Sequence, residues 1–278
     1  MSDAHIWRLV WSGFAPADVN MAVDEMLFEQ VAEGDAPPTL RIYGWEPPGV
    51  SIGFAQDLEQ GVDLEAVQRR GYGLVRRPTG GRAIIHRDEV TYSVCIRVGH
   101  LACGDSVVAS YREISRGIEA GLALLGVGAG IPDGRRDSPR KPADLPSICF
   151  ASSLGGDMEV AGRKIVGSAQ MRRSGAILQH GAIPITLDPA EHLEILGKHP
   201  RDAGNANGLS HHATTVAEVL GRSVCFDELG RAVVSGFAEA FGVLIAEQPL
   251  TDSEQARTAE LVESKYGTES WTRTRGRR

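Results

Sequence analysis

The sequence predicts a domain of the α/β class, because hydrophobic patterns of helical and of strand type both recur along the chain. One face of a helix is indicated over 19–31, where six apolar residues recur at helical spacing: Val19, Ala22, Val23, Met26, Leu27 and Val31. Over 90–96, apolar residues alternate with Thr91, Ser93 and Cys95, which is typical of a half-buried strand. We expect one domain over 1–250, because 278 residues fit a single large core and no linker is visible.

The first part of the chain is predicted to form a helix and several short strands. Asp18 is a candidate N-cap for the helix over 19–31, and a glycine and two prolines end that helix. Two short strands are expected over 40–43 and 50–54, on either side of a Pro-Pro-Gly turn. A short helix and a further strand follow before Pro78.

A strand over 90–96 and a long amphipathic helix over 107–125 come next. Residues 126–147 are rich in glycine and proline, and a loop of this length is usually functional or mobile. The later elements are a hairpin over 158–166 that turns at Ala161-Gly162, a strand over 176–185, and helices around 216–220 and 229–241. Residues 251–278 are expected to be a polar, partly frayed tail.

The composition excludes several classes of protein. Lys and Arg number 29 against 36 Asp and Glu, so the formal net charge is −7, and there is ample apolar sequence for a folded core. Four cysteines without CxxC spacing are too sparse for a disulfide scaffold. No apolar run could cross a bilayer, and the first residues lack the pattern of a secretory signal. We therefore expect a cytoplasmic protein with reduced thiols and no membrane partner.

The first candidate site is the segment 76–86, Arg-Arg-Pro-Thr-Gly-Gly-Arg-Ala-Ile-Ile-His. Gly80 and Gly81 would let the backbone approach a ligand closely, and Arg77 could meet an anionic group. The glycine pair alone favours a simple hairpin with solvated arginines. His86 alone is more typical of a packed histidine, and neither a Walker loop nor a GxGxxG fingerprint is present.

Lys164 and Cys149 are two further candidates. Lys164 lies among apolar and small residues and could place an ammonium in a pocket, although an exposed hairpin lysine is the simpler interpretation. Cys149 ends the long loop, and a cysteine nucleophile needs a nearby cation or base, which Lys164 could supply. A buried, inert thiol is the alternative for Cys149, and it suits Cys95 and Cys225 better.

The histidines do not predict a metal site. His180 lies within an apolar strand, and His211 and His212 lie in a turn rich in glycine and asparagine. A zinc site needs three or four convergent ligands, which these spacings do not supply. We expect no metal and no cofactor.

Four blocks of sequence, in order, resemble the superfamily of lipoate and octanoate protein ligases and transferases, which also contains the biotin protein ligases. The blocks are Asn-Met-Ala-Val-Asp-Glu at 20–25, the segment 76–86 continued by Glu-Val-Thr-Tyr-Ser at 89–93, Gly-Arg-Lys-Ile-Val-Gly-Ser-Ala-Gln at 162–170, and Ile-Leu-Gln-His-Gly at 177–181. A weaker similarity continues at Lys265-Tyr266-Gly267 and Trp271. The resemblance implies a mixed, mainly antiparallel sheet flanked by helices.

Within the superfamily, the chain is most similar to octanoyl transferases of the LipM type. Cys149-Phe150 stands where those enzymes keep a nucleophilic cysteine, and Thr-Gly-Gly-Arg at 79–82 replaces the Ser/Thr-Gly-Gly-Gly of ATP-using ligases. Ser152 opens a stretch where the family usually has a Pro-Ser turn. The resemblance implies that Cys149 carries the acyl group as a thioester and that Lys164 holds its carbonyl. It also implies a substrate-binding set consisting of Arg77, Thr79, Gly80, Gly81, His86, Tyr92, Gly167, Ser168, Ala169, His180 and Gly181.

The partners that the resemblance implies are octanoyl-acyl carrier protein as donor and lipoyl-domain proteins, such as glycine cleavage H protein or E2 subunits, as acceptors. Nucleic acid is a poor expectation, because the net charge is negative and aromatic residues do not interleave the arginines. Three alternatives remain open: an amidotransferase between lipoyl domains, an ATP-dependent lipoate ligase, and a non-catalytic acyl- or biotin-binding protein.

Overall fold

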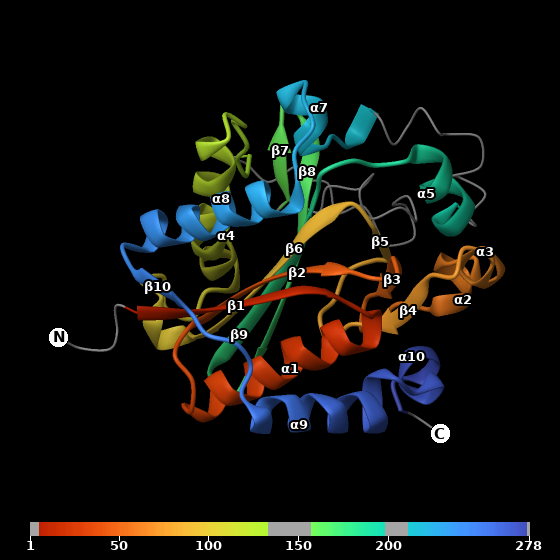
Figure 1. The fold of residues 1–278 in the computed structure, drawn as a ribbon, viewed down its shortest axis with the longest axis horizontal. Coiled ribbons are helices and arrows are strands. Elements are labelled where there is room, and N and C mark those ends of the chain that lie inside the picture. Colours follow the sequence, from red (N-terminus) through yellow and green to blue (C-terminus); the bar gives the residue numbers. More distant parts are fainter. Residues whose placement is uncertain (1–5, 133–156, 198–210, 277–278) are drawn as a thin grey trace.

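The computed structural model describes residues 6–132, 157–197 and 211–276, which form two sheets and the helices around them (Figure 1). The larger sheet has the strand order β10-β1-β2-β6-β9-β8-β7, and the smaller has the order β4-β3-β5. The strands are Ile6–Ala15 (β1), Thr39–Trp45 (β2), Gly49–Ile52 (β3), Gly73–Arg76 (β4), Ile84–His86 (β5), Glu89–Arg97 (β6), Met158–Val160 (β7), Arg163–Arg173 (β8), Ala176–Pro184 (β9) and Leu244–Glu247 (β10).

The larger sheet is mixed and mainly antiparallel. Its β1 runs parallel to β10 and β2, whereas β2, β6, β9, β8 and β7 pair antiparallel in turn. In the smaller sheet, β3 pairs parallel with β4 and antiparallel with β5. The predicted fold class is therefore confirmed, although the two short strands β2 and β3 belong to different sheets.

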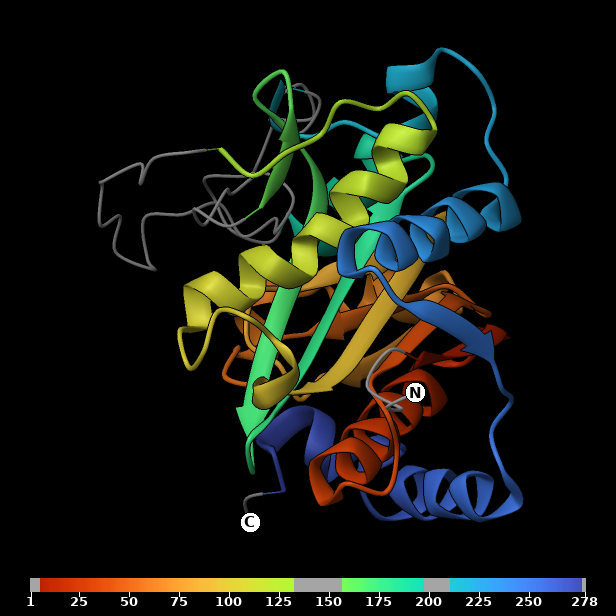
Figure 2. The ribbon, with the colours of Figure 1, turned by 90° about the vertical axis from the view of Figure 1, so that its left-hand side faces the viewer.

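Helices cover both faces of the larger sheet (Figure 2). On one face lie α4 (Val107–Leu124) and α8 (Phe226–Phe241), and on the other lie α1 (Ala17–Glu33) and α9 (Asp252–Leu261). The shorter helical segments are Leu58–Gly61 (α2), Leu64–Arg69 (α3), Val98–His100 (η2), Pro189–Leu196 (α5), Val216–Leu220 (α7), Val262–Tyr266 (η5) and Glu269–Thr274 (α10). The smaller sheet packs with α3 and α5 around a separate apolar cluster.

The central strands β2 and β6 are buried on both faces, because each face is covered by helices. Leu40 and Ile42 belong to the apolar cluster under α4 and α8, whereas Tyr43 and Trp45 belong to the cluster under α1. The prediction of a half-buried β6 is wrong, because Glu89 to Ile96 are all buried. Its polar positions face α1 instead of solvent, and this places hydroxyl groups in the protein interior.

The first helix begins two residues earlier than a cap at Asp18 would allow. Pro16 is the N-cap of α1, and the Asp18 carboxylate instead accepts the neighbouring Val19 amide. Gly34 ends the helix in the left-handed conformation, at φ 92°, as expected for a C-terminal glycine. The predicted hairpin also turns at Ala161-Gly162, both at positive φ.

The C-terminal segment is not a frayed tail, and the prediction for 251–278 is wrong over 252–274. Thr251 and Glu254 form a capping box that starts α9, and Glu254 also pairs with the buried Arg8, with 2.5 Å between Nη1 and Oε1. Tyr266 is 1% exposed and packs with α1. The segment folds because a few apolar side chains and buried ion pairs fix it to the same core as α1.

Candidate active site

A cavity of about 310 Å³ lies between the two sheets, next to the starts of α1 and α4. Its exposed rim includes Val107 and Val108, which are 57% and 68% exposed, so the cavity opens beside α4. Its lining is Met21, Tyr43, Trp45, Ser51, Arg77, Gly81, Ile84, His86, Thr91, Val107, Val108, Tyr111, Arg112, Asp157, Lys164, Gly167, Ser168, Ala169, His180, Gly181 and Ala182. This volume is at the small end of ligand pockets, which favours one small, mostly apolar group.

One wall is the glycine turn, residues 79–81, which Arg77 holds in place. The Arg77 guanidinium is buried and donates to the carbonyl oxygens of Gly80 (Nη2, 2.8 Å) and Arg82 (Nη2, 2.7 Å). It also donates to the Ser51 carbonyl at 3.1 Å. The interpretation of Arg77 as a solvated hairpin arginine is wrong, because the turn folds back over its side chain.

Thr79 and His180 connect the glycine turn to strand β9. Thr79 Oγ1 lies 2.6 Å from His180 Nε2, and His180 Nδ1 lies 2.9 Å from Asp24 Oδ2. Burial lowers the pKa of His180 and outweighs the hydrogen bond from its ring to Asp24. A neutral imidazole that donates from Nδ1 to Asp24 leaves Nε2 to accept the Thr79 hydroxyl proton, so the three groups have one consistent hydrogen-bond direction.

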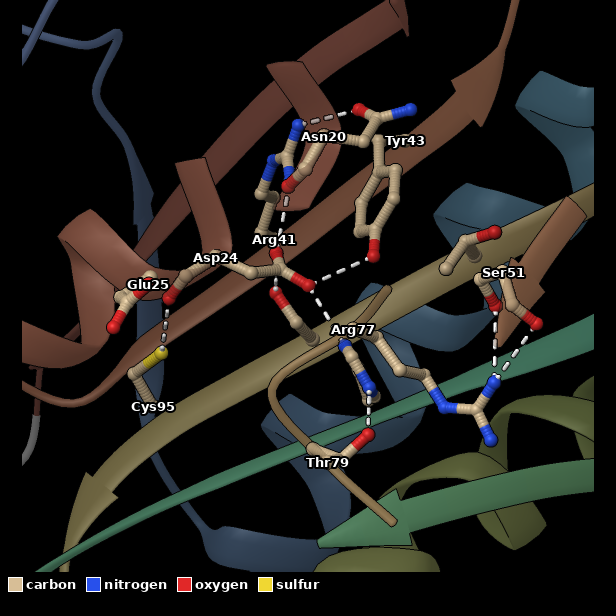
Figure 3. A network of polar contacts seen from close by, with 12 residues as sticks. Asn20, Asp24, Glu25, Arg41, Tyr43, Ser51, Arg77, Thr79 and Cys95 are labelled. Atoms are coloured by element: carbon tan, nitrogen blue, oxygen red, sulfur yellow. Dashed lines mark hydrogen bonds and ion pairs between the residues drawn. The ribbon is translucent and has the colours of Figure 1, made fainter. Parts of the chain in front are cut away.

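Asp24 is the centre of this network. Its Oδ1 accepts from Arg41 Nη1 at 2.8 Å, and its Oδ2 also accepts from Tyr43 Oη at 2.8 Å (Figure 3). The Oδ1 atom accepts from Ser93 Oγ as well, at 2.8 Å. Burial raises the pKa of Asp24, but the His180 hydrogen bond and the Arg41 charge outweigh it, so the pKa lies below its ordinary value. The carboxylate therefore stays ionised and holds β2, β6 and β9 to helix α1.

His86 belongs to a second polar cluster beside the cavity. Its ring stacks on Trp45 with 3.9 Å between centroids and 8° between planes. His86 Nε2 lies 2.7 Å from Ser51 Oγ, and Nδ1 lies 2.7 Å from Glu89 Oε1. The packed-histidine interpretation is consistent with these contacts, although the ring also forms part of the cavity wall.

The strands β8 and β9 provide the opposite wall. Ser168 faces Gly181 across the β8–β9 pair, and Gly167 and Ala169 flank it. A Cβ atom at Gly181 would lie 2.5 Å from Ser168 Oγ and 2.7 Å from the Gly167 carbonyl oxygen, so only glycine leaves this wall undisturbed. Tyr92 lies behind the wall, where its hydroxyl contacts Ser168 Oγ at 2.8 Å.

Lys164 also lines the cavity, at the start of β8. Its side chain is 3% exposed, and Nζ lies 3.0 Å from Asp157 Oδ1. The interpretation as an exposed hairpin lysine is therefore wrong, because β8 continues past the hairpin into the sheet that walls the cavity. Cys149 lies outside the described residues, so its predicted proximity to Lys164 stays a prediction.

The predicted residues differ in their relation to the cavity. Those in its lining are Arg77, Gly81, His86, Lys164, Gly167, Ser168, Ala169, His180 and Gly181. Thr79, Gly80 and Tyr92 do not line the cavity but contact residues that do. Thr79 bonds to His180, the Gly80 carbonyl accepts from Arg77, and the Tyr92 hydroxyl bonds to Ser168. Cys95 is buried under α1, where burial raises the pKa of its thiol well above the ordinary value, as suits an inert cysteine.

Sequence reasoning gave no role to the residues that organise the network. Asp24 and Asn20 lie four residues apart on an otherwise apolar helix face, and Arg41 interrupts an apolar strand between Leu40 and Ile42. Such positions signal buried polar contacts, because an unpaired charge in an apolar layer is costly. Trp45, which stacks on His86, had no comparable signal.

Among the residues that the structure describes, no group of three His, Cys, Asp or Glu side chains is placed to hold a metal ion. Within the same ranges, no helix has both the length and the apolar character needed to span a bilayer.

Comparison with known proteins identifies the family. The family model of the lipoyl protein ligase A/B catalytic domain matches residues 16–238. Octanoyltransferase LipM of Symbiobacterium thermophilum is 44% identical over 269 residues, covering 95% of this chain and 97% of that protein. Octanoyltransferase LipM of Bacillus subtilis is 34% identical over 270 residues, with coverage of 95% and 97%.

Solved structures agree with this relationship. The bipartite lipoate protein ligase of Thermoplasma acidophilum, described with its E2 lipoyl domain, superposes with a TM-score of 0.79 at 25% identity and covers 99% of this chain and 98% of its own. Lipoate-protein ligase A bound with ATP gives 0.77 at 26% identity, with coverage of 95% and 97%. The chain therefore belongs to the lipoyl protein ligase A/B family and, within it, to the LipM octanoyltransferases.

Proposed function

We propose that this chain transfers an octanoyl group from acyl carrier protein to a lysine side chain of a lipoyl domain, through a thioester on Cys149. The activity class follows from the family, which makes the chain an acyltransferase of lipoate biosynthesis. The observation that carries the rest is the small cavity with a buried lysine in its wall. An acyl chain fits the apolar lining, and a carbonyl group is the natural partner of the ammonium.

The cavity supplies the affinity for the acyl chain. Burial of one methylene group is worth about 0.8 kcal/mol, so the seven carbons beyond the octanoyl carbonyl can contribute roughly 5–6 kcal/mol. A shorter acyl chain loses part of this free energy. A longer chain must displace wall groups that are already hydrogen-bonded, such as Ser168 and His86.

Lys164 would act on the charge that develops during transfer. An ammonium shielded from water can donate to the thioester carbonyl oxygen and stabilise the oxyanion that forms when a nucleophile attacks. Asp157 holds Nζ at 3.0 Å and so limits the directions in which the ammonium can point. The same positive charge would favour the thiolate form of Cys149.

The transfer consists of two substitutions at one carbonyl carbon. In the first, the Cys149 thiolate attacks the octanoyl thioester of the carrier, and the carrier thiolate leaves and takes up a proton. In the second, the acceptor lysine amine attacks the Cys149 thioester and loses a proton, and the Cys149 sulfur leaves. The first step is nearly balanced in free energy and the second is downhill, so the reaction needs no ATP.

The test combines the full-length protein, octanoyl-acyl carrier protein and an apo lipoyl domain, with and without ATP. Transfer without ATP supports the proposal, whereas strict ATP dependence would show a ligase like the solved relative that binds ATP. In a parallel reaction an octanoylated lipoyl domain replaces the octanoyl-acyl carrier protein as donor, and transfer only in that reaction would show an amidotransferase. Binding of octanoate without any transfer would leave a non-catalytic acyl-binding protein.

Variants test the two catalytic residues. Cys149→Ser should abolish transfer and the octanoyl adduct seen by intact mass, and Cys225→Ser, at an exposed cysteine, is the matched control. Lys164→Met should reduce kcat by about 10²–10³-fold, as expected for loss of an oxyanion donor. Full transfer by Cys149→Ser would contradict the acyl-enzyme, and full transfer by Lys164→Met would contradict its proposed role.

A further inference from the structure

Arg76 is a buried arginine whose hydrogen bonds all go to backbone carbonyl groups. It ends β4, three residues before the glycine turn, and is 1% exposed. Its Nη1 donates to three carbonyl oxygens of the loop after β3, those of Gly53 (2.9 Å), Phe54 (3.0 Å) and Gln56 (2.7 Å). Burial lowers the pKa of Arg76, and the backbone carbonyl dipoles, together with the negative charge of Asp57, stabilise the buried guanidinium.

The other side of Arg76 is bound by the C-terminal helix α10, which lies beside β4 (Figure 1). Arg76 Nε donates to the Thr272 carbonyl at 3.0 Å and Nη2 to the Arg273 carbonyl at 3.3 Å. The last carbonyl groups of a helix have no partner within the helix, so they are available to an outside donor. In return, Trp271 Nε1 donates to the Arg76 carbonyl at 2.9 Å.

Trp271 is fixed from several sides. Lys265 Nζ lies 4.2 Å from its ring centroid, and the same ammonium pairs with Glu25 of α1 at 2.5 Å. The rings of Tyr266 and Phe54 lie 5.8 and 6.0 Å from that of Trp271. These contacts hold the indole ring, and with it the N–H group, in a fixed orientation relative to α1 and to the loop after β3.

The contact continues from Arg76 to the cavity over a short path. Phe54 donates its backbone N–H to the Thr79 carbonyl at 2.8 Å. Gly53 packs so closely that a Cβ atom there would overlap the Gly81 carbonyl oxygen. Since Gly81 lines the cavity, any shift of the loop after β3 moves the cavity wall.

We propose that Trp271, acting through Arg76 and the loop after β3, is a positioning residue for the glycine turn and so for the acyl-binding wall. The proposal rests on the proposed function, because the substrate group that the wall would position is the octanoyl chain. The helix that performs this role lies beyond residues 16–238, the part of the chain that the family model matches.

The test compares Trp271→Phe, which removes the indole N–H but keeps an aromatic ring, with Thr251→Ala. The control weakens the N-cap of α9 in the same C-terminal segment and touches neither Arg76 nor the turn. Trp271→Phe should raise the KM for octanoyl-acyl carrier protein about five-fold, as for one lost hydrogen bond, with kcat nearly unchanged. Thr251→Ala should lower the melting temperature about as much as Trp271→Phe does, but it should leave KM at the wild-type value.

Hydrogen–deuterium exchange gives a readout that does not need the substrate. Exchange should become faster at the Phe54 and Arg77 amides in Trp271→Phe but not in Thr251→Ala, since those amides bond to the turn and to β3. Equal KM values and equal exchange in both variants would overturn the proposal. Arg76→Lys removes the guanidinium that contacts the loop after β3 and should also make exchange faster at the Phe54 and Arg77 amides. Failure of the wild-type protein to transfer octanoate would instead contradict the proposed function, and the exchange result would still stand.

Discussion

Replacement of Asp24 by asparagine tests whether the buried carboxylate holds the fold around the cavity. The two Asp24 oxygens accept from four side chains, at 2.8 to 2.9 Å, and the carboxylate is fully buried. An asparagine of the same shape offers one oxygen and one NH₂ group. Two of the four donors then face another donor, and Arg41 keeps its positive charge without a counter-charge.

The expected cost is large because the partners stay buried. Removal of one member of a buried ion pair typically costs about 3–5 kcal/mol, against a total stability of about 5–15 kcal/mol for a domain. For a chain of this size, about 1 kcal/mol corresponds to roughly 2–4 °C, so the melting temperature should fall by about 6–20 °C. Transfer should weaken as well, because His180 loses the acceptor that orients it towards Thr79.

Urea unfolding followed by tryptophan fluorescence measures this loss, and Glu228→Gln is the matched control. Glu228 pairs with Arg222 at 2.7 Å, but both side chains are exposed to a third or more, so water solvates the charge that remains. The control should leave the unfolding midpoint close to that of the wild type. Equal midpoints for Asp24→Asn and Glu228→Gln would refute the reasoning, because a buried charge would then behave like an exposed one.

Two further predictions concern pH and packing. Burial lowers the pKa of His180 and of His192 below 6.5, so between the native pKa and about 6.5 the unfolded chain binds more protons than the native one. The free energy of unfolding should therefore fall as pH drops below about 6.5, by at most about 1.4 kcal/mol per pH unit for each histidine. His192→Gln should reduce that slope in urea titrations at several pH values, and an unchanged slope would contradict the assignment. Gly181→Ala should cost about 1–3 kcal/mol and weaken transfer, because its methyl group meets Ser168, whereas Gly128→Ala enters open space; similar midpoints for the two would argue against a tight wall.

Local patterns predict much of the fold, since the helices over 107–125 and 229–241 and the hairpin at Ala161-Gly162 depend on contacts near in sequence. The motif blocks likewise predict which segments approach the cavity. The structure adds their relative register: Tyr92 faces Gly181, and Gly181 faces Ser168, across three adjacent strands. Register over such distances is set by the whole sheet, so no single segment encodes it.

The polar network was missed for a different reason. Alternation along β6 indicates one apolar and one polar face, and a polar face is ordinarily assigned to solvent. Here a second helix layer covers that face, and the hydroxyl of Ser93 and the guanidinium of Arg41 bind Asp24 instead. The alternation predicts which side chains share a face of the sheet. Whether that face is exposed to solvent depends on whether a helix layer covers it.

The C-terminal segment is a second case in which polar sequence does not mean exposure to solvent or disorder. Its polar composition suggested a frayed tail, yet Thr251 and Glu254 have the spacing of a capping box, which is a local signal for a helix start. Composition is a poor guide to the structure of this segment, because the segment needs few apolar contacts. Its charged residues Glu254 and Lys265 instead form ion pairs with Arg8 and Glu25, which lie more than two hundred residues away in the sequence. A charged helix of this kind is stable only on the core that supplies those partners. The contact between Trp271 and Arg76 therefore exists only while this segment is folded on the core, which is why its effect on the glycine turn must be measured with the C-terminal segment present.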